Sequence, residues 1–130
     1  MPTVVIRDET SAGKVDWEVI LNDIPHRLTL ADLIRRRVRE EVARANAEPG
    51  RDFRTLVKPV DSEATLNGYR FRQPKQIDWE RQAAVAEEAF KRNGFFVIIG
   101  DRQVEDLDEE IDLTVETDVR FVRLVPLVGG

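Results

Sequence analysis

The sequence contains no cysteine and a single histidine, His26. Without cysteine the chain has no disulfide bond, no thiolate metal site and no covalent cysteine chemistry, so any thioester belongs to a partner. One histidine cannot form a metal site or a catalytic dyad unless carboxylates complete it, and the sequence singles out none; we expect His26 in a solvated loop after Pro25. No Ser-His-Asp set or paired catalytic carboxylates stand out either, so we expect neither a metal site nor enzymatic activity in this chain.

Long hydrophobic runs are also absent, since none approaches the ~18 residues that a membrane-spanning helix needs. Met1-Pro2-Thr3 does not begin a signal peptide, and we expect a cytoplasmic protein with no membrane partner. The net charge of −5 repels nucleic acid, and the aromatic residues are not interleaved with basic ones as a stacking surface would require. Nucleic acid is therefore not an expected ligand.

The composition is that of a folded globular protein, with 42% hydrophobic and 35% charged residues in a chain of 130. This length suits one domain that buries roughly two-thirds of the surface exposed by its unfolded chain. We expect a single monomeric domain over residues 1–130.

The first part of the chain predicts a β-hairpin followed by a long helix. Residues 3–8 and the alternating segment 15–21 flank a glycine-containing turn, as in an antiparallel hairpin. Thr29 suits the N-cap of a helix with Asp32 three residues later, and Pro49-Gly50 ends it. One face of this helix carries charges that we expect to be solvated rather than to form an anionic-ligand site: Arg35, Arg36, Arg37, Arg39 and Glu40.

The following segment predicts a small hairpin and a second helix. Asn67-Gly68, between two short stretches of strand-forming residues, is a strong hairpin signal. Asp78 is the expected cap of the second helix and Gly94 its C′ residue. We expect Trp79 and Phe90 of this helix in the core.

The last third predicts a central strand at 95–99, a turn at Gly100-Asp101 and a final strand from about 117 to 125. Between them lies an acidic turn with apolar anchors. We expect its carboxylates to be solvated; docking of a partner is the second interpretation, and a Ca²⁺ loop is disfavoured because the EF-hand spacing and glycine are absent. The acidic run consists of Glu105, Asp106, Asp108, Glu109, Glu110 and Asp112.

The sequence closes with Gly129-Gly130 behind an apolar stretch. Two residues without Cβ can enter a narrow active site in which other side chains would clash, so a terminal Gly-Gly carboxylate can itself be a reacting group. A frayed end of small residues is the ordinary alternative. The residues before the pair favour a reactive end.

The order of elements predicts an α+β fold of the β-grasp type, with a mixed sheet and one long helix. Residues 96–111, FVIIGDRQVEDLDEEI, resemble the C-terminal half of ubiquitin around its Ala-Gly-Lys-Gln-Leu-Glu-Asp turn. Residues 117–130, TDVRFVRLVPLVGG, are similar to the ending of the molybdopterin-synthase small subunit and of the thiamine sulfur carrier. The resemblance covers residues 3–48 in element order and 95–130 in motifs. Small family members lack the hairpin-helix insertion at about 51–93, between the helix and the third core strand.

In ubiquitin-like and sulfur-carrier proteins the terminal carboxylate attacks the α-phosphate of ATP on an adenylating enzyme, and the resemblance implies this role for Gly130. The acyl group then passes to a partner cysteine and an amine, giving an isopeptide bond, or accepts sulfur as a thiocarboxylate. We expect no cofactor in this chain, because it has no glycine-rich phosphate loop; the partner would handle ATP and Mg²⁺. The implied partners are an activating enzyme, a conjugating enzyme and protein targets.

Two surfaces are predicted to meet these partners. In the tail, about 126–130, Pro126 stiffens the chain, and Leu127 and Val128 either bury apolar area in a partner, at about 25 cal/mol per Å², or end the last strand. The second surface is an apolar patch on the sheet, unless the insertion covers it. Its residues are Phe96, Ile98, Val122 and Leu124.

Three functions remain open at this stage. The leading hypothesis is a ubiquitin-like modifier that is activated at Gly130 and joined to amines. The first alternative is a sulfur carrier, which the proline-containing tail favours. The second is a β-grasp interaction module that is never activated and binds through its sheet or its insertion.

Overall fold

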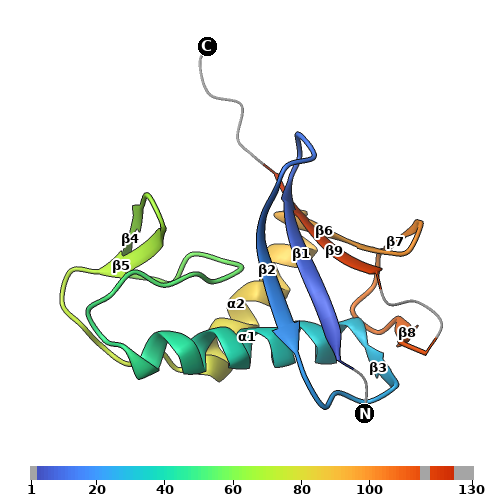
Figure 1. Cartoon of the computed structure of the whole chain (residues 1–130), viewed down its shortest axis with the longest axis horizontal. Helices are drawn as coiled ribbons and strands as arrows, with labels where there is room; N and C mark the ends of the chain where they lie inside the picture. Colours follow the sequence, from blue (N-terminus) through green and yellow to red (C-terminus); the bar gives the residue numbers. More distant parts are fainter. Residues whose placement is uncertain (1–2, 115–117, 125–130) are drawn as a thin grey trace. The chain divides into compact units, whose positions relative to one another are not determined.

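The computed structural model describes residues 3–114 and 118–124. The chain divides into two compact units, one made of Met1–Leu33 and Ala89–Gly130 and the other of Ile34–Glu88. It is α+β: the described residues form a mixed sheet, two small two-stranded sheets and two helices (Figure 1).

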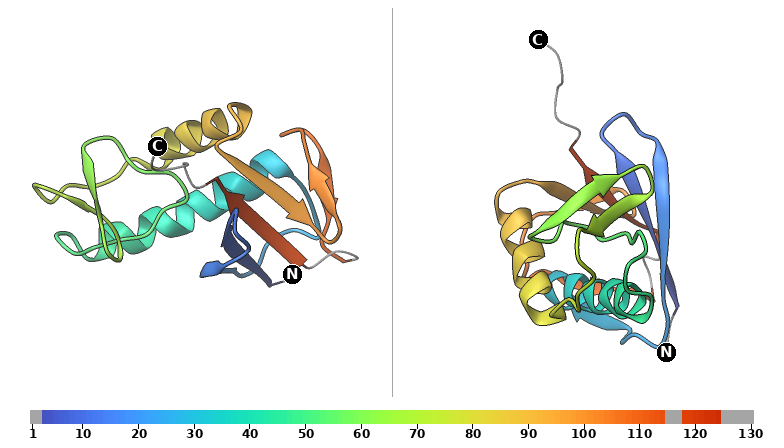
Figure 2. Two further views of the ribbon diagram at one scale, coloured as in Figure 1. Left: turned by 90° about the horizontal axis from the view of Figure 1, so that it is seen from above. Right: turned by 90° about the vertical axis from the view of Figure 1, so that its left-hand side faces the viewer.

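The first unit is built on a five-stranded sheet with the strand order β2-β1-β9-β6-β7 (Figure 2). Strands β1 and β9 are parallel, and the other neighbours are antiparallel. The final strand therefore lies inside the sheet, between the first strand and β6. The strands are β1 (Val4–Thr10), β2 (Val15–Leu21), β6 (Phe95–Ile99), β7 (Arg102–Val104) and β9 (Asp118–Arg123).

Side-chain alternation decides which face of this sheet is buried. Val97 and Phe121 lie opposite each other on β6 and β9 and are fully buried, whereas the next pair, Phe96 and Val122, is half-buried. The strands predicted at 3–8, 15–21 and 95–99 are confirmed, and so is the final strand within its described residues.

The second helix, α2 (Trp79–Lys91), ends in the first unit. Gly94 N donates to Ala89 O at 2.8 Å and Asn93 N donates to Phe90 O at 3.0 Å, the paired bonds of a Schellman motif. Asn93 has the positive φ, 61°, so the prediction that Gly94 is the C′ residue is wrong. Asparagine tolerates this left-handed conformation. Phe90 is buried as predicted and packs on Phe95, with ring centroids 5.7 Å apart.

Sequence periodicity misses two short strands, β3 (Arg27–Thr29) and β8 (Glu110–Asp112), which pair with each other. Leu28 and Ile111 are opposite each other in this pair and are buried. Three residues are too few for alternation to be recognised, and the acidic segment was expected to be a turn. His26 is exposed, as expected, and its carbonyl oxygen accepts a hydrogen bond from Leu113 N at 2.7 Å.

The long helix, α1 (Leu30–Ala47), begins as predicted. Asp32 N donates to Thr29 Oγ1 at 3.1 Å, which satisfies one of the free backbone donors of the first turn. Leu30 N donates to Glu109 O at 3.0 Å and Ala31 N donates to Leu107 O at 2.9 Å. These bonds join the start of the helix to the acidic segment within the first unit.

In the second unit the predicted hairpin is formed by β4 (Ser62–Thr65) and β5 (Gly68–Phe71), but its turn is one residue earlier than the Asn67-Gly68 signal implies. Thr65 pairs with Gly68, and neither turn residue has a positive φ. Gly68 has φ 139°, and a Cβ there would overlap the carbonyl oxygen of Phe53. Phe53 also forms a two-bond bridge with Tyr69, so glycine serves this close approach rather than the turn.

The prediction of a uniformly solvated arginine face on α1 is wrong at one position, because Arg37 is only 1% exposed. Arg37 Nε donates to Glu41 Oε1 at 2.5 Å, and the side chain of Glu41 is 4% exposed. Leu56 N donates to the second oxygen, Glu41 Oε2, at 2.8 Å. The segment after the helix thus supplies a backbone donor to a buried ion pair, a long-range contact that helical periodicity does not indicate.

Asp78 caps α2 as predicted, accepting from Glu80 N at 3.1 Å. Trp79 was expected in the core but is half-buried. The guanidinium groups of Arg35 and Arg39 lie 5.3 and 5.5 Å from the centre of its ring. Trp79 is the first residue of its helix, and these cations lie over its ring.

Candidate functional site

The strand that leads to the predicted reactive end is held on both sides. β9 pairs with β1 and β6 along its length, and Leu124 is the last described residue after it. The predicted tail residues Pro126, Leu127, Val128, Gly129 and Gly130 lie outside the described residues. The site that can be described is therefore the root of the tail and the sheet face around it.

The root of the tail is anchored by pairing and by one ion pair. Arg123 lies opposite Thr10 of β1 and Phe95 of β6. Its Nη2 donates to Asp16 Oδ2 at 2.7 Å, and both side chains are less than a third exposed. The last residue of β9 is thus joined to β1, β6 and the start of β2, so any segment that follows begins from a fixed point.

The structure brings the predicted sheet patch together. Phe96 and Val122 are direct neighbours on β6 and β9, and Ile98 follows two residues after Phe96 on the same face. These three side chains are half-buried, and Leu124 is 47% exposed. Phe96 and Ile98 alternate with the buried residues of the opposite face, which is why they keep exposure although β6 is apolar throughout.

A charged network beside this patch was not found from the sequence. Arg7 Nη1 lies 3.3 Å from Asp118 Oδ1, and Arg7 Nε lies 3.6 Å from Glu18 Oε1. Arg120 Nη1 lies 3.5 Å from Glu9 Oε2. The two pairs of Arg7 are exposed and contribute about 0–1 kcal/mol each, so their main effect is to place polar groups next to the apolar patch. The sequence does not indicate the network, because Arg7 meets Asp118 only through the pairing of β1 with β9, more than 100 residues later in the chain.

The shifted pKa values belong to two other places. Arg70 Nε donates to Asp52 Oδ1 at 2.6 Å, and this bond lowers the pKa of Asp52 and raises that of Arg70. Thr65 Oγ1 donates to the other Asp52 oxygen at 3.0 Å and acts in the same direction on Asp52. These three residues belong to the hairpin of the second unit or the segment before it.

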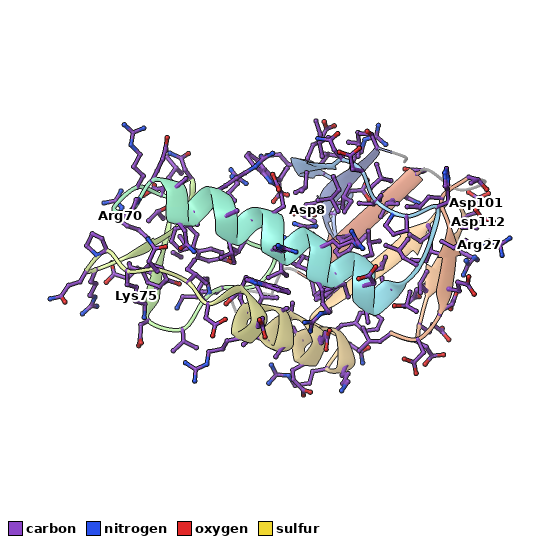
Figure 3. All side chains as sticks on the ribbon, turned by 90° about the horizontal axis from the view of Figure 1, so that it is seen from below. Asp8, Arg27, Arg70, Lys75, Asp101 and Asp112 are labelled. Atoms are coloured by element: carbon purple, nitrogen blue, oxygen red, sulfur yellow. The ribbon has the colours of Figure 1, made fainter. Side chains whose placement is uncertain are left out.

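In the first unit, hydrogen bonds from Thr114 lower the pKa of Asp112, mainly through the side chain at 2.5 Å and then through the backbone N at 2.9 Å. The nearby cation of Arg27, with its Nε 3.5 Å from Asp112 Oδ2, adds to the effect (Figure 3). Each of these pKa shifts comes from a hydrogen bond or ion pair with a neighbouring side chain or backbone group.

Two negative findings concern the described ranges, 3–114 and 118–124. They contain no group of three or more His, Cys, Asp or Glu side chains that could hold a metal ion. Within the same ranges, neither helix combines the length and the apolar character that crossing a membrane would require.

Comparison of the chain with protein-family models, with curated proteins and with solved structures finds no match.

Proposed function

We propose that the chain contains a ubiquitin-like β-grasp domain. If the five strands of the main sheet are counted in chain order, their spatial order is second, first, fifth, third and fourth, with the first and fifth parallel. A hairpin followed by a long helix and a last strand beside the first is the plan expected from the resemblance to ubiquitin. On this proposal, residues of about 51–93 form an insertion that carries β4, β5 and α2.

We propose further that the protein is a modifier whose Gly130 carboxylate is activated by a partner. The observation that carries the proposal is the place of β9: it is an inner strand of the sheet, and in the sequence Leu124 is followed by six residues of which the last two are Gly129-Gly130. Six extended residues reach at most about 20 Å, enough to enter another protein's active site while the sheet remains outside. The half-exposed patch of Phe96, Ile98 and Val122 would then meet the activating enzyme beside the tail.

The chemistry needs only a free carboxylate on Gly130 from this chain. A carboxylate oxygen attacks the α-phosphate of ATP bound to the partner, pyrophosphate leaves, and an acyl-adenylate forms. A partner cysteine thiolate then attacks the carbonyl carbon and displaces AMP, and a lysine amine of a target displaces the thiolate to give an isopeptide. Glycine at both final positions lets the carbonyl carbon approach the nucleophile without side-chain clash.

Tryptic mass spectrometry of proteins from the native host tests the proposal. Trypsin cleaves after Arg123, and no lysine or arginine follows it, so a modified target lysine should carry Leu-Val-Pro-Leu-Val-Gly-Gly, residues 124–130. Conjugates that lack this remnant would argue against isopeptide formation through Gly130. So would a remnant that is found but is not attached to lysine.

Two tail variants provide the controls. Gly129→Trp and an alanine added after Gly130 should leave the folded sheet unchanged, because both lie beyond β9, and should abolish conjugates. They should also abolish ATP-pyrophosphate exchange by the cognate activating enzyme. An unchanged exchange rate would remove the basis for Gly130 as the reacting residue.

A sulfur carrier is the second candidate function, favoured by the similarity of Pro126-Leu127-Val128-Gly129-Gly130 to sulfur-carrier tails. The first step would be the same adenylation, after which hydrosulfide delivered by a partner attacks the carbonyl carbon, AMP leaves and a thiocarboxylate forms. Intact-mass analysis of the protein from its native host separates the candidates. Exchange of one oxygen for sulfur indicates a carrier, amide-linked conjugates indicate a modifier, and a persistently free acid indicates an interaction module that is never activated.

A further inference from the structure

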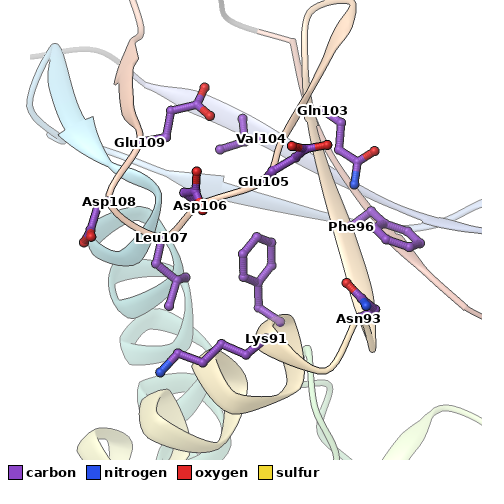
Figure 4. Close-up of a pocket in the computed structure, with 11 residues that line it drawn as sticks. Lys91, Asn93, Phe96, Gln103, Val104, Glu105, Asp106, Leu107, Asp108 and Glu109 are labelled. Atoms are coloured by element: carbon purple, nitrogen blue, oxygen red, sulfur yellow. The ribbon is translucent and has the colours of Figure 1, made fainter.

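The first unit contains a groove of about 880 Å³ that shares one residue, Phe96, with the sheet patch (Figure 4). It lies between the end of α2, strand β6 and the acidic segment after β7. A cavity of this volume is in the range that holds a ligand or a short peptide segment. All its lining residues belong to one compact unit.

The groove has apolar side chains from three elements and the segment that follows the last of them. Phe90 comes from α2, Phe96 from β6, Val104 from the end of β7 and Leu107 from the acidic segment. Phe90 and Val104 are buried, whereas Phe96 and Leu107 are half-buried and keep surface for a ligand. A large apolar side chain of a partner could therefore be desolvated here.

The remaining charge of the groove is negative. Glu109 is neutralised by an ion pair with Arg102, and the other lining carboxylates are Glu105, Asp106 and Asp108. Within the part of the chain that the structure describes, these three form no side-chain ion pair, and all three are exposed. Lys91 is the one cationic residue among the described lining residues. The charges complement a basic ligand and disfavour an acidic one.

We propose that this groove binds a basic peptide segment of a partner protein, with one large apolar side chain between lysine or arginine residues. The apolar side chain lies against Leu107, and the flanking cations pair with Asp106 and Asp108. This second docking site does not depend on activation of Gly130. The acidic segment, expected from sequence to be a solvated turn, thus forms one wall of a recognition site.

The test uses ¹⁵N-labelled full-length protein and the synthetic peptide Gly-Lys-Arg-Phe-Arg-Lys-Gly. The amide signals of residues lining the groove should shift and saturate, and added salt should weaken binding several-fold because exposed ion pairs are screened. Peptides with glutamate in place of every cation, or glycine in place of phenylalanine, should bind at least about tenfold more weakly.

Charge-matched variants separate this site from general attraction to an acidic protein. Asp106→Lys and Asp108→Lys should each weaken binding about five- to tenfold. Asp101→Lys changes the net charge equally, at an exposed turn position that does not line the groove, and should have little effect. All three replace exposed side chains, so the amide spectra of the free variants should remain those of the folded protein.

Three results would overturn the proposal. The first is equal weakening by Asp101→Lys, and the second is equal binding of the glycine-substituted peptide; both indicate charge attraction alone. The third is a response of the groove amides to Ca²⁺ with none to the peptide, which would assign the carboxylates to a cation.

Loss of tail conjugation in the Gly129→Trp variant with peptide binding intact would separate this site from the function proposed for Gly130.

Discussion

The buried ion pair of the second unit allows the sharpest test of the structure. Glu41→Gln keeps the size of the side chain but removes its negative charge, which faces Arg37. It also replaces one of the two carboxylate oxygens that accept hydrogen bonds from Arg37 Nε and Leu56 N. Breaking a buried pair by neutralising one partner costs about 3–5 kcal/mol, because the remaining charge stays out of water. Both residues make further interactions, so we expect about 3 kcal/mol, the lower end of that range.

Glu40→Gln is the matched control, one residue earlier on the same helix. Glu40 Oε1 accepts from Arg44 Nε at 3.1 Å, but the two side chains are 43% and 60% exposed. An exposed pair four residues apart in a helix contributes about 0.3–0.5 kcal/mol. The same chemical change at adjacent positions should thus differ about sixfold or more in its effect on the free energy of unfolding.

Urea denaturation followed by tryptophan fluorescence measures the difference. With an m-value of about 2 kcal/mol per molar urea, Glu41→Gln should lower the midpoint by about 1.5 M and Glu40→Gln by only about 0.2 M. Amide hydrogen exchange at Leu56 reports the same contact locally and should accelerate only in Glu41→Gln. Equal midpoints for the two variants, with Leu56 protection unchanged, would refute the buried pair.

Two further predictions concern the hairpin of the second unit. Gly68→Ala should disrupt the pairing of β5 with Phe53, because φ is 139° and the new Cβ would overlap a backbone oxygen; Gly13→Ala, at φ 86° with no atom within 4 Å, should cost only about 1 kcal/mol in the unfolding free energy. Similar losses for the two would contradict the close approach. Arg70→Gln should raise the pKa of Asp52 toward its ordinary value, as measured by carboxyl NMR titration. Because the folded pKa is lowered, Asp52 stabilises the fold above its unfolded pKa and loses this contribution as pH falls through the folded pKa; an unshifted Asp52 in the variant would exclude Arg70 as the cause.

Much of the fold follows from local signals. The alternation of residues 15–21, the caps Thr29 and Asp78 and the apolar run 95–99 each predict an element that the structure contains. These signals depend on residues within a few positions of one another. The pair β3–β8 was not predicted, because each strand has only three residues and their pairing joins segments far apart in the sequence.

The candidate site was predictable in part. Phe96 and Val122 were grouped from the expectation that their strands are neighbours, and the register places them directly opposite. The groove was not predicted, because its lining combines Phe90 and Leu107 from segments whose proximity no local pattern encodes. The acidic run indicated negative charge in this segment, but it did not indicate a concave surface.

By itself the sequence determined the absence of cysteine chemistry, the amphipathic strands and helices with most of their caps, and the Gly-Gly pair behind an apolar stretch. These properties depend on composition and on contacts between near neighbours along the chain. The tertiary structure alone decided that β3 pairs with β8, that Arg37 is buried against Glu41, and that three exposed carboxylates border a groove with apolar side chains. Each of these arrangements joins residues from separate elements, where burial and pairing decide which side chains meet and override local preference.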